Sequence, residues 1–121
     1  TMVEHRAGDE NYESLKKNRE NLSKIRLETG KQAQIIELPM PTAVYHEGNR
    51  LPASYANFCI TNRSVIVPTF EVPEDEPALE ILQNCFPGRK VVGLNSRLIS
   101  WGLGSFHCLS RQEPAVKTPE N

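Results

Sequence analysis

Long apolar runs are missing from this 121-residue sequence, and so is an excess of charge of either sign. No stretch approaches the roughly 20 apolar residues that a membrane-spanning helix needs. Fourteen basic residues stand against 15 acidic residues, which gives a net charge of −1. A nucleic-acid-binding surface needs clustered lysine and arginine instead. The composition therefore favours neither a membrane nor a nucleic acid as a partner.

Cysteine is also scarce, with widely spaced residues at Cys59, Cys85 and Cys108. An odd number at such spacing is not typical of a disulfide framework. No spacing of cysteine and histidine matches a zinc site, so we expect no metal. These features favour reduced thiols in a cytoplasmic protein. We interpret Cys85, near the end of a predicted helix, as a buried packing residue.

The apolar spacing predicts a first helix over residues 10–29. Asp9 is suited to the N-cap and Gly30 to the position after the last turn. The apolar residues that recur on one face are Tyr12, Leu15, Leu22 and Ile25. We interpret this segment as an amphipathic helix on the surface of the protein.

Short strands are expected at residues 34–38, 55–60, 64–70 and 90–94, and a second helix at about 74–86. Residues 61–63 have the length of a hairpin connection, and Pro68 is expected to end the ladder of its strand. The segment 39–50 has the composition of a long loop. We interpret His46 in this loop as a surface residue, with a substrate contact as the alternative.

The order of these elements contains an internal repeat. Strand, helix, strand occurs at about residues 1–38 and again at about 64–94. An additional strand before the second copy makes it a ββαβ unit, from Tyr55 to Leu94. A unit that cannot bury its own sheet face needs neighbours. The sequence therefore predicts an α/β fold built from repeated units.

The most informative stretch is residues 101–108, WGLGSFHC. We call residues 101–105 the glycine loop. Its two glycines allow the main chain to approach a ligand closely, and a thiol follows at Cys108. We expect residues 106–110 to form a strand, in which His107 and Cys108 point to opposite faces. His107 is then a poor candidate for the base that activates Cys108.

Two segments carry a resemblance to a known family. Residues 102–115, GLGSFHCLSRQEPA, resemble the C-terminal signature of the agmatine deiminase and bacterial peptidylarginine deiminase family. Upstream, residues 51–58 (LPASYANF) and 65–70 (VIVPTF) are similar to its LPASYxNF and VxVPxF hairpin. The two motifs occur in the family's order and separation, and the resemblance extends from about Asp9 to Ala115.

The resemblance implies the pentein-type α/β propeller, five ββαβ units around a pseudo-fivefold axis. About two units would be present: a partial unit at 1–50 and a full unit at 51–97. The nucleophile loop and a closing strand would follow at 98–115, and a flexible tail at 116–121. The family is about three times longer, which implies a C-terminal part. The remaining propeller units would then be its partners, and a homo-oligomer is left open.

The resemblance also implies the chemistry. Cys108 would attack the guanidinium carbon of agmatine, ammonia would leave, and water would release N-carbamoylputrescine from a thiouronium intermediate. No cofactor is implied. The residues expected to contact the substrate are Trp101, Gly102, Leu103, Gly104 and Ser105.

The sequence departs from the family in two respects. The family's acid–base histidine lies in a Gly-His-x-Asp segment, which none of His5, His46 and His107 matches, so we expect this chain to be inactive alone. Leu103 replaces the middle glycine of the commoner GGGNIHC pattern and Ser105 replaces its asparagine, which leaves the substrate open.

Three questions remain open at this stage. The first alternative function is a peptidylarginine deiminase, which converts protein arginine to citrulline. The second is a non-catalytic module that retains the ββαβ scaffold. Tyr55 and Asn57 are compatible equally with strand packing and with a role in shaping the substrate pocket.

Overall fold

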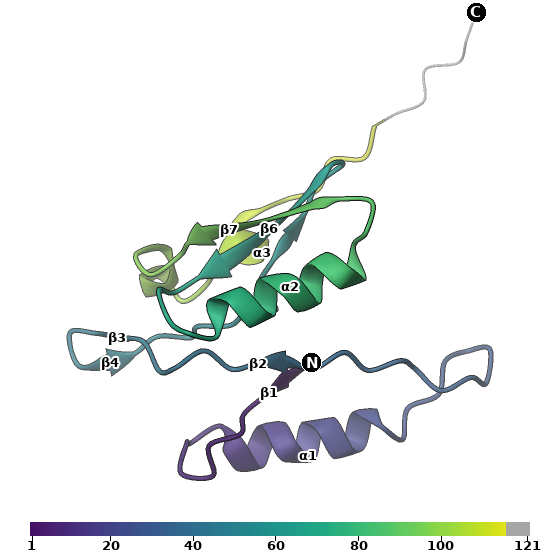
Figure 1. The fold of residues 1–121 in the computed structure, drawn as a ribbon, viewed down its shortest axis with the longest axis horizontal. Helices are drawn as coiled ribbons and strands as arrows, with labels where there is room; N and C mark the ends of the chain where they lie inside the picture. The colour runs from purple at the N-terminus through teal and green to yellow at the C-terminus, as the bar shows by residue number, and fades with distance from the viewer. Residues whose placement is uncertain (116–121) are drawn as a thin grey trace, which may run out of the picture.

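The computed structural model describes residues 1–115 as an α/β fold (Figure 1). The predicted tail at 116–121 lies outside the described residues. In chain order the elements are β1 (Met2–Val3), α1 (Tyr12–Leu22), β2 (Leu38–Pro39), β3 (Tyr45–His46), β4 (Asn49–Arg50), β5 (Cys59–Ile60), β6 (Ser64–Thr69), α2 (Asp75–Cys85), β7 (Lys90–Asn95), the 3-10 helix η1 (Ile99–Gly102) and α3 (Phe106–Leu109).

The predicted ββαβ unit is confirmed in elements β5, β6, α2 and β7. β5 and β6 form an antiparallel hairpin across residues 61–63. β6 and β7 are parallel and in register from Ser64 opposite Lys90 to Thr69 opposite Asn95, with α2 as the crossover. Parallel strands need a crossover of this length, whereas antiparallel strands need only a tight turn.

The prediction that Pro68 ends the ladder was wrong, because β6 continues to Thr69. The Lys90 amide donates to Arg63 O and the Ser96 amide to Thr69 O. Odd-numbered residues of β6 therefore bond to β7. Pro68 faces the other edge, beyond the end of β5, where a missing N–H breaks no strand pair.

The first βαβ unit has the predicted order but shorter elements. β1 and β2 are parallel on either side of α1. The helix ends at Leu22 rather than Thr29, because Ile25 finds no surface to pack against and stays half exposed. Residues 26–32 instead turn back on themselves around Gly30, whose φ of +75° favours glycine. The predicted strand at 34–38 is reduced to β2.

Helix α2 lies between the β1–β2 pair and the β5–β6–β7 sheet (Figure 1). Ala78 and Leu82 on α2 are buried. The prediction that Cys85 is buried was wrong, because it is the last residue of α2 and its side chain is exposed beyond the edge of the core.

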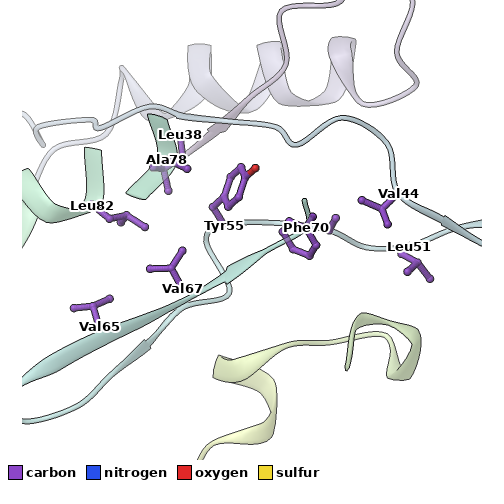
Figure 2. Packing of buried hydrophobic residues seen from close by; sticks show 10 residues of the cluster. Leu38, Val44, Leu51, Tyr55, Val65, Val67, Phe70, Ala78 and Leu82 are labelled. Atoms are coloured by element: carbon purple, nitrogen blue, oxygen red, sulfur yellow. The ribbon is translucent and has the colours of Figure 1, made fainter. Parts of the chain in front are cut away.

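The hydrophobic core gathers around β6 and α2 (Figure 2). Its buried residues are Leu38, Val44, Leu51, Ala53, Tyr55, Val65, Val67, Phe70, Ala78 and Leu82. Segments before and after the hairpin therefore share one core.

Tyr55 is fully buried in a turn rather than in the strand predicted for 55–60. Its hydroxyl donates to the Asp75 carboxylate at 2.7 Å, and the amides of Phe70 and Val72 donate to the same carboxylate. This arrangement favours the packing interpretation of Tyr55.

The strand predicted at 106–110 was also wrong, because this segment forms the short helix α3 against β6. No strand pairs with this segment within residues 1–115. The amides of His107 and Cys108 donate to Asn57 instead, at 3.2 Å each. No helix among the described residues is both long enough and apolar enough to cross a bilayer.

Candidate functional site

Cys108 is held at two points by a single asparagine. Asn57 Nδ2 donates to Cys108 Sγ at 3.0 Å, and the Cys108 amide donates to Asn57 Oδ1 at 3.2 Å. The amide of His107 donates to the Asn57 carbonyl at 3.2 Å. The turn that precedes β5 is thereby fastened to α3, and the position of the sulfur is fixed relative to the core.

These contacts change the acidity of the thiol. Cys108 is exposed, and the Asn57 hydrogen bond lowers its pKa below the ordinary value for cysteine. A backbone hydrogen bond from Ser105 adds to the effect. Donors that point at the sulfur stabilise the thiolate, which is the nucleophilic form. An exposed thiol with such donors is suited to attack a ligand.

The two glycines of the glycine loop differ in what surrounds them. A Cβ at position 104 would lie 2.8 Å from Cys108 Cβ and 3.2 Å from its sulfur, which is too close for any side chain. A Cβ at Gly102, the last residue of η1, would meet nothing within 4 Å. Gly104 is therefore the glycine that lies directly against the Cys108 side chain, and the expected approach of the loop to a ligand stays a prediction.

Leu103 adopts a backbone conformation that leucine rarely occupies. Its φ of 63° and ψ of 22° lie in the left-handed region, and its side chain is 80% exposed. It lines one side of an open pocket of about 450 Å³, together with Leu51 and Ser54. Cys108 is not among the residues that line this pocket within the described chain. The contact of Leu103 with a substrate stays a prediction.

Trp101 stands at the start of the glycine loop and is 56% exposed. Its ring lies 4.1 Å from that of His46, centroid to centroid, at an angle of 55°. His46 was interpreted as a surface residue, but β3 holds it half buried and its Nε2 has no hydrogen-bond partner among residues 1–115. One face of Trp101 is thus supported by the β3–β4 hairpin.

Ser105 is buried, and its hydroxyl is hydrogen-bonded to that of Ser96. Its side chain therefore points into the protein, and only its main chain can face a ligand. The prediction named Ser105 for its main-chain groups, and that reading stays a prediction. Ser96 was not predicted, because a serine after a strand carries no signal of its own.

The described residues place no acid–base partner on the Cys108 thiol. Within residues 1–115, no hydrogen bond joins an imidazole or a carboxylate to the Cys108 sulfur. His107 neighbours Cys108 in α3, and adjacent helical residues do not face each other. We therefore still expect that His107 is not the base, but the reason is the geometry of a helix and not that of the predicted strand.

Comparison with known proteins relates the chain to deiminases. The family model described as Porphyromonas-type peptidyl-arginine deiminase matches residues 1–114. A protein of Marinomonas sp. (strain MWYL1), assigned as an agmatine deiminase, is 42% identical across 70% of this chain and 28% of its own length.

Solved structures give the same relation. A Porphyromonas gingivalis crystal structure, assigned as an arginine deiminase, superposes with a TM-score of 0.90 and 37% identity, over 93% of this chain and 33% of the other. The structure of C. jejuni agmatine deiminase gives a TM-score of 0.78 and 36% identity, over 88% and 32%. The chain spans about a third or less of the length of these relatives.

Proposed function

Because the chain belongs to the Porphyromonas-type peptidyl-arginine deiminase family, we propose that it supplies the nucleophile of a hydrolase that acts on guanidinium groups. The observation that carries this proposal is the Cys108 thiol, exposed and bracketed by the Asn57 amide at 3.0 Å. A guanidinium carbon is deactivated by charge delocalisation. It therefore needs a strong nucleophile such as a thiolate.

The proposed reaction proceeds in two halves. Cys108 Sγ forms a bond to the guanidinium carbon, and a carbon–nitrogen bond breaks as ammonia leaves with a transferred proton. An S-alkylthiouronium remains on the enzyme. Water then adds to the same carbon, the carbon–sulfur bond breaks, and the ureido product leaves as the thiolate is restored.

This chain contributes two parts of that machinery. Asn57 holds the sulfur and favours its ionised form, and the main chain of the glycine loop lies beside it. The proton for ammonia and the base for water come from residues that this sequence does not contain. The 121-residue chain by itself is therefore expected to release no ammonia at steady state.

The proposed substrate is agmatine, with N-carbamoylputrescine as the product. The names of the Marinomonas and C. jejuni relatives support it. Protein arginine is the second candidate, and the name of the family model favours it. Beyond the guanidinium group, agmatine ends in a small amine, whereas a protein arginine continues into a peptide backbone. The residues of the glycine loop proposed to meet this difference are Trp101 and Leu103, both largely exposed.

The proposed setting is a five-unit propeller. In support, the β1–α1–β2 unit and the ββαβ unit pack in sequence with α2 between their sheets (Figure 1). Two such units would leave sheet faces and edges for further units to cover. Residues 1–50, 51–97 and 98–115 would then form the partial unit, the full unit and the nucleophile segment.

The decisive experiment is a chimera. Residues 1–114, the range that matches the family model, replace the corresponding segment of the Marinomonas relative, and ammonia release is followed with agmatine and with a blocked arginine peptide. The unaltered relative is the positive control, and Cys108→Ser in the chimera is the matched negative control.

The proposal predicts ammonia release from agmatine that falls by a factor of about 1,000 or more in Cys108→Ser. A preference for the arginine peptide would support the second candidate. A chimera that melts cooperatively yet turns over neither substrate, beside an active relative, would support a non-catalytic module and overturn the proposal.

A further inference from the structure

Three buried serines lie in the glycine loop or in the segment that leads into it. Ser96, Ser100 and Ser105 are exposed by only 0%, 1% and 3%. The Ser96 hydroxyl is 2.5 Å from that of Ser105 and 3.4 Å from that of Ser100. Hydroxyls buried in a loop are costly unless they are paired. Ser105 is thus the closer of the two hydroxyl partners of Ser96.

Ser96 is itself fixed to the core. Its amide donates to the Thr69 carbonyl at 2.8 Å, which continues the ladder between β6 and β7 by one residue. Its carbonyl accepts from the Ser100 amide at 2.8 Å, at the start of η1. The hydroxyl of Ser96 thus occupies a position set by the central sheet.

Ser105 connects this fixed point to the thiol. It occupies the N-cap position of α3, where a serine side chain commonly accepts from the backbone of the first turn. Here the side chain makes no such bond and reaches Ser96 instead. Its carbonyl accepts from the Leu109 amide at 3.0 Å, which closes the turn that contains Cys108. The preceding residue, Gly104, lies directly against the Cys108 side chain.

We propose that the buried hydroxyl pair of Ser96 and Ser105 holds the glycine loop against the Cys108 side chain, which makes Ser105 a positioning residue for the thiol. This inference rests on the proposed function, because it concerns the same nucleophile. It explains why the Ser105 side chain is turned inward. The substrate would meet only the main chain of this residue.

The pairing has a chemical consequence. The backbone of Ser105 contributes to the lowered pKa of the Cys108 thiol, after the larger contribution of Asn57. If the Ser105 hydroxyl loses Ser96, the N-cap residue is free to rotate toward the ordinary capping geometry. The backbone of Ser105 would then turn away from the sulfur, and the pKa of the thiol would rise.

The test measures alkylation of Cys108 by iodoacetamide as a function of pH, in a Cys59→Ser, Cys85→Ser background. Ser105→Ala is expected to slow alkylation at pH 7 by about fivefold and to move the pH profile to higher pH. Ser96→Ala removes the same hydrogen bond from the other side and should have the same effect. Ser105→Thr keeps the hydroxyl and should restore most of the rate.

Ser100→Ala is the matched control, because it also removes a buried serine hydroxyl but one that does not contact Ser105. It should lower the melting temperature without moving the profile. The double variant Ser96→Ala, Ser105→Ala should be no slower than either single variant, because both remove one shared bond.

Equal shifts of the pH profile in Ser100→Ala and Ser105→Ala would mean that any loss of a buried serine hydroxyl loosens the loop, and this would overturn the inference. An unchanged pH profile in Ser105→Ala, or additive losses of rate in the double variant, would also overturn it. Iodoacetamide needs no deimination. An inactive chimera together with these shifts in the pH profile would therefore contradict the proposed function but not this inference. An active chimera with unchanged pH profiles would contradict this inference but not the proposed function.

Discussion

The ββαβ unit, from Tyr55 to Leu94, and the glycine loop both contact Cys108, through Asn57 and Gly104 respectively, but are built in opposite ways. The unit buries its apolar side chains, among them Val65 and Val67 at 0% exposure. The glycine loop exposes Trp101 and Leu103, and holds the latter in a strained conformation. The difference indicates a division of roles. The unit provides a fixed frame, and the proposed role of the loop is to present its groups to a ligand.

If the division holds, damage to the frame should cost stability. Asp75 accepts hydrogen bonds from the Tyr55 hydroxyl and from the amides of Phe70 and Val72. Asp75→Ala leaves these buried donors unpaired and should lower the free energy of unfolding by about 3 kcal/mol. Urea denaturation measures this loss.

Glu76→Ala is the matched control, because Glu76 is also an acidic residue in the first turn of α2 but is exposed. Its loss should stay below about 0.5 kcal/mol. Equal losses in the two variants would mean that helix charge, and not the buried hydrogen bonds, stabilises this end of the frame.

Damage to the contact between loop and thiol should instead cost reactivity. Gly104→Ala places a Cβ 2.8 Å from Cys108 Cβ, so the sulfur must move away from Asn57. Alkylation of Cys108 should slow by about tenfold. Gly102→Ala, where a Cβ meets nothing within 4 Å, should react at the native rate. Equal rates in the two variants would contradict the contact.

Relief of backbone strain in the glycine loop should raise the free energy of unfolding, whereas damage to the ββαβ unit should lower it. Leucine in the left-handed region costs about 1–2 kcal/mol, and a glycine adds about 0.5–1 kcal/mol of unfolded-state entropy. Leu103→Gly should therefore raise the free energy of unfolding by about 0.5 kcal/mol. Leu98→Gly, at a residue equally exposed but with a φ of −69°, should lower it. A loss in both variants would argue against stored strain.

The smallest predicted effect is on the stability of the protein at low pH. Arg6 hydrogen-bonds to the Glu4 carboxylate and holds the pKa of that carboxyl below its ordinary 4.5. Because the folded pKa is the lower one, the contribution of Glu4 is complete above pH 4.5 and is lost as the pH falls through the folded pKa. The melting temperature of Glu4→Gln should decline less steeply below pH 4.5 than that of the native chain. Parallel slopes would contradict this assignment.

The sequence was most informative where one element decides its own structure. The three-residue connection at 61–63 predicted the hairpin, and the apolar spacing over 74–86 predicted α2. These features depend on local spacing. The ββαβ order followed from the sequence of these elements along the chain.

The sequence was least informative where distant residues compete for the backbone. Asn57 and Cys108 are 51 residues apart, and their pairing turned a predicted strand into α3. The end of α1 at Leu22 depends on the absence of a surface for Ile25 within the described residues. Neither feature produces a periodic pattern in the sequence, so each becomes apparent only in the folded structure.

The central claim is that Asn57 makes Cys108 an activated thiol. The most direct test is competitive alkylation by iodoacetamide at pH 7, in which mass spectrometry compares Cys108 with Cys85, a second exposed cysteine of the same chain. The account predicts that Cys108 reacts about tenfold faster and that Asn57→Ala removes most of this advantage. Equal rates at the two cysteines in the native chain would contradict it.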